Sequence, residues 1–124
     1  MAKECPLCQS EQIAFFQTEP FLRCEKCYLI FKDPSVHLSP EDEKKRYASH
    51  DNRIDNPGYV KFLTPALNEV LNRVPFPAKG LDYGCGPIPV LATLLRTKGY
   101  ETTHYDPYFF PSDLNQPTAF DFIT

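Results

Sequence analysis

Four of the five cysteines form two pairs near the N-terminus, and their spacing could support metal chemistry. Two residues separate the cysteines of each pair, and fifteen lie between the pairs, which are Cys5 with Cys8 and Cys24 with Cys27. This spacing lets both sulfur atoms of a pair reach one ion, and two pairs complete the tetrahedral coordination that Zn²⁺ favours. We therefore predict a structural zinc ribbon with these four ligands. A redox-active Cys-x-x-Cys pair or a four-cysteine iron site is the alternative.

A second group of residues, around a tight turn, could bind a nucleoside-like ligand. Asp82 lies in a short predicted strand, and Gly84 and Gly86 follow it, before a predicted helix. Asp106 comes 20 residues after Gly86, at the end of the next predicted strand. A strand, a Gly-x-Gly turn and a helix form the start of a doubly wound nucleotide-binding fold. An acid at the end of the following strand accepts hydrogen bonds from ribose hydroxyls.

Two prolines indicate which ligand this turn favours. Pro87 and Pro89 have no N–H group at the start of the helix, where a pyrophosphate needs donors, and Pro89 occupies the place of the third glycine in a dinucleotide motif. A dinucleotide-dependent oxidoreductase is therefore disfavoured. S-adenosylmethionine has no phosphate and does not need those donors.

Asp82, Gly84 and Gly86 resemble the first motif of the class I S-adenosylmethionine-dependent methyltransferases, with Ile88 in the place of the third glycine. The resemblance implies a Rossmann-like domain whose glycine turn lies against the methionine and ribose portions of the cofactor. It also implies that Asp82 serves the methionine ammonium and that Asp106 binds the ribose hydroxyls. With its cysteine pairs and residues 47–59, the chain is similar to bacterial methyltransferase-like proteins of unassigned substrate. The resemblance does not identify the methyl acceptor or the catalytic residues.

Other residues near these motifs allow two interpretations. Residues 106–109, Asp-Pro-Tyr-Phe, resemble the Asp-Pro-Pro-Tyr motif of amino-methyltransferases, but that motif follows a fourth strand, and here the residues follow a second. Four polar or aromatic residues could line the cofactor pocket or form a surface cluster: Tyr47, His50, Asn52 and Tyr59. We interpret Cys85 as a small residue at a tight turn, since no Cys/His pair can be named for it.

The elements that must position these residues are short and bounded by proline, of which the chain has 13. Apolar and β-branched runs predict strands at 13–17, 21–23, 28–31, 80–83, 101–106 and 120–124. Helical periodicity predicts helices at 39–50, 57–73 and 89–98. We expect Ser39 and Asn56 to cap the first two helices, and Pro65 to kink the second or make it restart with Thr64 as cap. Residues 107–118 are predicted to form a loop.

We predict a mixed α/β chain with a zinc ribbon at 1–33, a helical connector at 34–78 and a partial Rossmann-like methyltransferase domain at 79–124. The 46 residues of the last segment are too few for a six-stranded doubly wound sheet, so this domain is expected to be incomplete. Its open sheet edge predicts a homodimer or marginal stability.

Charge and hydropathy restrict the partners and the compartment. The formal net charge of −3 does not indicate nucleic-acid binding, although a local basic patch is compatible with it. No apolar run is long enough to span a membrane, the N-terminus lacks a secretory signal, and we expect a cytoplasmic protein. Besides a methyltransferase acting on an unknown acceptor, the alternative function is a non-enzymatic zinc-ribbon module that recognises protein or nucleic acid.

Overall fold

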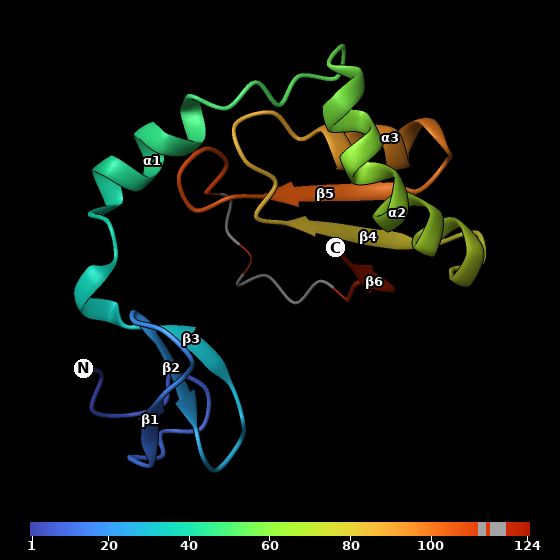
Figure 1. Ribbon diagram of the computed structural model, residues 1–124. Helices are drawn as coiled ribbons and strands as arrows, with labels where there is room; N and C mark the ends of the chain where they lie inside the picture. The colour runs from blue at the N-terminus through green and yellow to red at the C-terminus, as the bar shows by residue number, and fades with distance from the viewer. Residues whose placement is uncertain (112–113, 115–118) are drawn as a thin grey trace. The chain divides into compact units, whose positions relative to one another are not determined.

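The computed structural model describes residues 1–111, 114 and 119–124, and these residues divide into two compact units, Met1–Glu43 and Lys44–Thr124 (Figure 1). Within the described residues there are three α-helices and two small sheets, which confirms a mixed α/β fold. None of the helices in this part of the chain is long and apolar enough to cross a membrane. The predicted loop at 107–118 lies partly outside the described residues.

The first unit is built on a three-stranded antiparallel sheet in which β2 (Phe21–Cys24) lies between β1 (Ile13–Phe15) and β3 (Ile30–Lys32). Leu22 and Cys24, on alternate positions of the central strand, are fully buried. Because side chains alternate across a strand, β2 directs one face of this sheet toward the cysteines.

Strands β1 and β3 are displaced from their predicted bounds by backbone turns. Gln17 has a φ of 56° and Tyr28 a φ of 62°, in the left-handed region that strands do not use. Strand β1 therefore ends before Gln17, and β3 begins after the turn that contains Tyr28. The unit closes with a 3₁₀ turn, η1 (Pro34–Val36), whose N-terminus is capped by Asp33 through the Ser35 N–H at 3.0 Å.

Both of the predicted helix caps before the second sheet are present. Helix α1 (Pro40–Ala48) follows Ser39, whose hydroxyl oxygen accepts from the Asp42 N–H at 3.2 Å. Helix α2 (Pro57–Arg73) follows Asn56, whose side chain accepts from the Gly58 and Tyr59 N–H groups.

The predicted restart of α2 at Thr64 is wrong, because the helix is continuous through Pro65. The Thr64 hydroxyl donates to the Val60 carbonyl one turn earlier at 2.8 Å instead of capping a new helix. Pro65 lies on the exposed side of α2, where a carbonyl left without its helical donor can bond to water. The apolar stripe on the other side of α2 packs into the core and holds the helix together.

The second unit contains a parallel sheet of order β5-β4-β6, formed by β4 (Lys79–Tyr83), β5 (Glu101–Tyr105) and β6 (Phe122–Ile123). Helix α3 (Val90–Thr97) connects β4 to β5. The chain then returns to the other side of β4, and β6 is shorter than the predicted 120–124. All three strands point the same way, so their carboxyl ends meet at one edge of the sheet.

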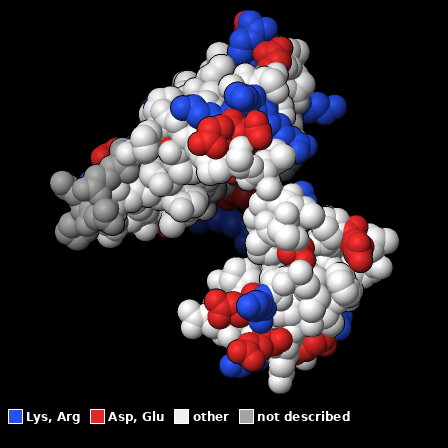
Figure 2. Space-filling view, turned by 90° about the vertical axis from the view of Figure 1, so that its left-hand side faces the viewer, with Lys and Arg blue, Asp and Glu red and all other residues white. Residues whose placement is uncertain are grey.

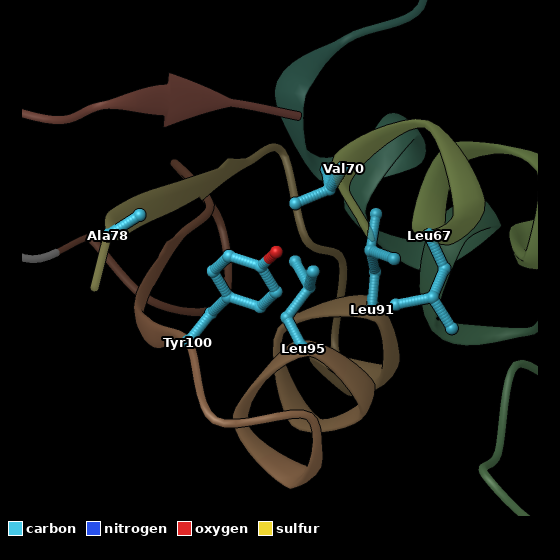
Figure 3. Packing of buried hydrophobic residues seen from close by; sticks show 6 residues of the cluster. All are labelled: Leu67, Val70, Ala78, Leu91, Leu95 and Tyr100. Atoms are coloured by element: carbon cyan, nitrogen blue, oxygen red, sulfur yellow. The ribbon is translucent and has the colours of Figure 1, made fainter. Parts of the chain in front are cut away.

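The core of the second unit lies between this sheet and helices α2 and α3 (Figure 3). Its six buried members are Leu67, Val70, Ala78, Leu91, Leu95 and Tyr100. Phe122 packs against the cluster, and its ring lies over Gly80, where an added Cβ would be 2.1 Å from the nearest ring atom. A side chain at residue 80 would therefore force the Phe122 ring out of this position.

Of the two edge strands in the described sheet, β5 is partly blocked by a side chain. The Arg96 guanidinium donates from Nε to the Thr102 carbonyl at 2.8 Å and contacts His104 Nδ1 at 2.7 Å. A charged side chain bonded to an edge carbonyl hinders pairing with another chain. The predicted homodimer stays a prediction.

Candidate functional site

The four paired cysteines converge on one point in the first unit. Their Sγ atoms all lie within 4.8 Å of one another, and the Cys5–Cys27 and Cys8–Cys24 separations are both 3.6 Å. A disulfide requires about 2.05 Å, so these sulfur atoms are not bonded to each other. With Zn–S bonds of about 2.3 Å, sulfur atoms at the corners of a tetrahedron lie about 3.8 Å apart. The cluster therefore has the dimensions of a four-thiolate metal site.

The two cysteine turns, residues 5–9 and 24–28, have the same backbone geometry. In each, the N–H of the residue after the second cysteine donates to the carbonyl of the first at 2.9 Å, from Gln9 to Cys5 and from Tyr28 to Cys24. That residue has a positive φ in both turns, 57° for Gln9 and 62° for Tyr28. The first cysteine of each turn also donates its N–H to the carbonyl five residues later. This bonding directs both thiols of a turn to the same side.

The electrostatics of the cluster favour a cation between the sulfur atoms. A hydrogen bond from the Cys27 N–H lowers the pKa of Cys24 to about 6, although burial opposes this shift. A hydrogen bond from Leu29 lowers the pKa of Cys27, but burial and the other cysteine side chains outweigh it and raise that pKa to about 12. Neighbouring thiolates repel one another, so four of them ionise together only with a compensating positive charge.

The predicted glycine turn is the second candidate site, at the carboxyl end of β4. Gly84 and Gly86 have φ values of 82° and 74°, which side chains rarely tolerate. A Cβ added at either position would have no atom of the described residues within 4 Å, so among these residues the space beside the turn is open. The N–H groups of Gly84 and Cys85 both donate to the Tyr105 carbonyl, which ties the turn to the end of β5.

Asp106 is buried and bonds to this turn. Its Oδ2 accepts from the Gly86 N–H at 3.0 Å, and its Oδ1 accepts from the N–H groups of Tyr108 at 2.9 Å and Phe109 at 3.3 Å. One carboxylate therefore fixes both the glycine turn and the segment that follows β5. The sequence predicted that the glycine turn and Asp106 would serve one ligand, and the structure joins them to each other through the Gly86 N–H.

Asp82 is also buried, and its carboxylate reaches the start of α3. Oδ2 accepts from the Ala92 N–H at 3.1 Å, while Pro89, at the N-cap position, offers no side-chain acceptor. Burial raises the pKa of Asp82, although the Ala92 hydrogen bond and the electrostatic influence of the nearby His104 and Arg96 side chains oppose this rise. The role of helix cap was missed from the sequence; the absence of a capping side chain before Val90 was its signal.

Cys85 lies between the two glycines and close to both acids. Its thiol is buried and donates to the Gly86 carbonyl at 3.4 Å. Burial, together with the negative charges of Asp82 and Asp106, raises the pKa of Cys85 to about 11. The thiol is therefore protonated at neutral pH and is not a nucleophile there.

Of the aromatic residues that the sequence singled out before β4, Tyr59 has a pKa that the charged groups of this site shift. Burial raises the pKa of Tyr59, and the charges of Asp82 and Cys85 raise it further. Tyr47 and His50 are exposed and contact each other edge to face, with ring centroids 6.0 Å apart. This contact is typical of the surface cluster that was the alternative to pocket lining.

Charged side chains of both signs are interspersed on the face of the molecule shown in Figure 2. The chain as a whole carries 13 basic and 16 acidic residues. The prediction that charge does not indicate a nucleic-acid partner stays a prediction.

Comparison with protein-family models, curated proteins and solved structures found no match to this chain.

Proposed function

We propose that the second unit carries the cofactor-binding part of an S-adenosylmethionine-dependent methyltransferase. The observation that supports this most is the pair of buried carboxylates, Asp82 and Asp106, beside an open glycine turn. Two negative charges in a site of low exposure favour a ligand with positive charge, and S-adenosylmethionine carries an ammonium and a sulfonium. The absence of N–H groups at Pro87 and Pro89 disfavours a ligand that is bound through a pyrophosphate.

The strand arrangement supports the same proposal and a Rossmann-like interpretation of the sheet. The chain passes from β4 to β5 on one side and returns to β6 on the other side, so the order of connections reverses at β4. In open α/β sheets, ligands bind outside the carboxyl ends of the strands at such a reversal. The glycine turn begins where β4 ends, and Asp106 directly follows β5.

The residues present fit the cofactor in distinct roles. When bound, S-adenosylmethionine would supply an electrophilic methyl group. Asp82 would attract the ammonium, Asp106 would accept hydrogen bonds from the ribose hydroxyls, and Gly84 and Gly86 would let the backbone approach the ligand. The chain's contribution is to position the ligand and exclude water from it. Because Cys85 is protonated at neutral pH, it is not assigned as a general base.

We propose Zn²⁺ as the ion of the four-cysteine site, with a structural role in a zinc ribbon. Four thiolates leave no open coordination position, so the ion would stabilise the first unit rather than perform chemistry. Metal analysis of protein purified without chelator should give about one zinc per chain. Iron at the same ratio, with charge-transfer absorption, would contradict zinc and favour the iron alternative.

Calorimetric titration tests the cofactor assignment. The zinc-loaded chain should bind S-adenosylmethionine saturably, while NADH should give no saturable binding. Asp106→Asn should weaken S-adenosylmethionine binding roughly tenfold or more, as expected for a lost hydrogen bond to a charged group. Asp55→Asn, which removes an exposed carboxylate outside the turn, is the matched control and should not change the affinity. Absence of saturable binding by folded wild-type protein would contradict the proposal.

The exposed apolar side chains of the first unit favour a second candidate function, a zinc-ribbon module that binds a protein partner. Leu7 and Tyr28 project from the two cysteine turns and are 68% and 71% exposed, and Phe15 in β1 is 61% exposed. Large apolar side chains that are this exposed occur often at sites of protein interaction. A chain that binds zinc but not S-adenosylmethionine, and that co-purifies with a partner lost in Leu7→Ser and Tyr28→Ser, would favour this candidate.

A further inference from the structure

Tyr59 lies on the buried stripe of α2, one turn before its packed residues. Leu63, Leu67, Val70 and Val74 contact the core at intervals of three and four residues. Tyr59 precedes Leu63 by four residues, so it shares that face of the helix. Phe62 is off the stripe and 75% exposed, although its ring stacks on Tyr59 with centroids 6.2 Å apart.

The packing of α2 on α3 directs the N-terminal end of this stripe toward the carboxyl ends of the strands, the edge of the sheet that carries the glycine turn. At one end, the Tyr100 hydroxyl donates to the Val74 carbonyl at 2.6 Å, and Tyr100 directly precedes β5. Toward the other end, Leu67 lies beside Leu91 in the first turn of α3 (Figure 3). From Leu67 back to Tyr59, the helix extends about 12 Å further. This length carries Tyr59 past the start of α3, to the level of residues 84–89.

The first turn of α2 is held in place by hydrogen bonds. Asn56 accepts from the Tyr59 N–H at 3.3 Å and donates from its amide to the Asp51 carbonyl at 2.8 Å. The shift in the pKa of Tyr59 toward higher values, caused by burial and by the charges of Asp82 and Cys85, agrees with a ring that faces the turn. Tyr59 therefore lies at the carboxyl edge of the sheet, on the same side as the glycine turn and the two buried acids.

We infer that Tyr59 is a cofactor-contacting residue whose ring lies against the sulfonium of S-adenosylmethionine; this inference rests on the proposed function. An aromatic ring attracts a cation placed over its face through its quadrupole, and desolvation strengthens the attraction. The ammonium has the carboxylate of Asp82 as a partner. The sulfonium is a cation that is not a hydrogen-bond donor, so an aromatic ring is a suitable partner for it.

Comparing S-adenosylmethionine with S-adenosylhomocysteine isolates this contact, because the two differ in the charge on sulfur and the methyl group and share the ammonium and ribose. We expect wild-type chain to bind S-adenosylmethionine more tightly. Tyr59→Leu should reduce the ratio of the two affinities by about three- to thirtyfold, the range of a cation–π contact. Tyr59→Phe should keep the ratio, and so should Phe62→Leu, which removes the exposed neighbouring ring.

Circular dichroism and thermal unfolding verify that each variant is folded, and Tyr59→Met is a second non-aromatic variant. If folded Tyr59→Leu and Tyr59→Met keep the wild-type ratio of the two affinities, the inference about Tyr59 is wrong. The proposed function is not affected by that result. Equal weakening of both ligands would also overturn the inference, since the ring would then act only through packing. If the folded wild-type chain binds neither compound, the proposed function fails, and the inference fails with it.

Discussion

The first unit, Met1–Glu43, and the second, Lys44–Thr124, bury different kinds of residue. Among the described residues of the first, the fully buried side chains are two cysteines and Leu22. The second instead buries a cluster of aliphatic and aromatic side chains from two helices and a sheet. A unit of about 40 residues rarely buries enough apolar surface to be stable without a metal or disulfides. We therefore expect a bound metal ion to stabilise the first unit and the apolar core to stabilise the second.

Removal of the metal is the largest expected perturbation, and it should separate the two units. Chelation, or Cys24→Ser, should unfold the first unit, because structural zinc binding contributes on the order of 10 kcal/mol to folding. The second unit should keep its structure. Cys85→Ser is the control that removes a thiol outside the cluster. ¹H–¹⁵N NMR spectra would measure both units at once. If chelation removes the folded-state NMR signals of both units, the two units are not stabilised independently, and this expectation is wrong.

A cavity in the core should destabilise the second unit and leave the first unit unchanged. Leu95 is fully buried between α3 and the sheet, and Leu95→Ala should destabilise the second unit by about 2–5 kcal/mol. The zinc content and the first unit's NMR signals should not change. Denaturant unfolding gives the free energy change, and a value below about 1 kcal/mol would show that this core is not what holds the second unit.

In the second unit, Asp82→Asn should increase stability and weaken cofactor binding. Because burial raises the folded-state pKa of Asp82 above its unfolded value, its contribution to stability is full below the unfolded pKa and is lost as pH rises through the folded pKa. Asn keeps an acceptor for the Ala92 N–H without the charge. The variant should be more stable than wild type at neutral pH, by about 1 kcal/mol, and should bind S-adenosylmethionine more weakly.

Thermal unfolding from pH 3 to pH 8 would measure this difference. The stability advantage of Asp82→Asn should vanish at the acidic end, where wild-type Asp82 is protonated. An advantage that is independent of pH would contradict a charge effect, and a loss of stability at neutral pH would show that the ionised carboxylate is the better helix cap.

Gln9→Gly is the smallest expected effect and concerns the first unit. Gln9 has a φ of 57°, a region where a side chain costs roughly 1 kcal/mol relative to glycine. The substitution should slow zinc loss to a chelator and stabilise the zinc-bound unit by about this amount. Gln17→Gly relieves a similar φ outside the cysteine turns and is the matched control. Zinc loss that is faster in Gln9→Gly than in wild type would contradict the positive φ of residue 9 in the first cysteine turn.

The sequence predicted those features that depend on local spacing. The cysteine pairs converge, and Ser39 and Asn56 cap their helices, because each depends on a short pattern with one physical solution. These local contacts do not establish the methyltransferase assignment, which remains a proposal.

Features that depend on packing between distant segments could not be predicted. Only tertiary contact shows that Phe122 covers Gly80, or that β6 pairs on the far side of β4 from β5. Thr64 resembled a helix cap because Pro65 breaks the local pattern, but core packing outweighs that break. Helix α2, which we had assigned to a connector, packs in the core of the second unit. The division of the chain into three segments remains a prediction.

One NMR titration tests the central claim most directly, that the second unit binds the cofactor and the first is a metal-stabilised structural unit. S-adenosylmethionine added to the ¹⁵N-labelled, zinc-loaded chain should shift the amide signals of Gly84, Gly86 and Tyr59, all in the second unit. Signals from the cysteine turns should stay in place. Saturable shifts confined to the cysteine turns, or no shifts in a folded chain at millimolar ligand, would contradict the account.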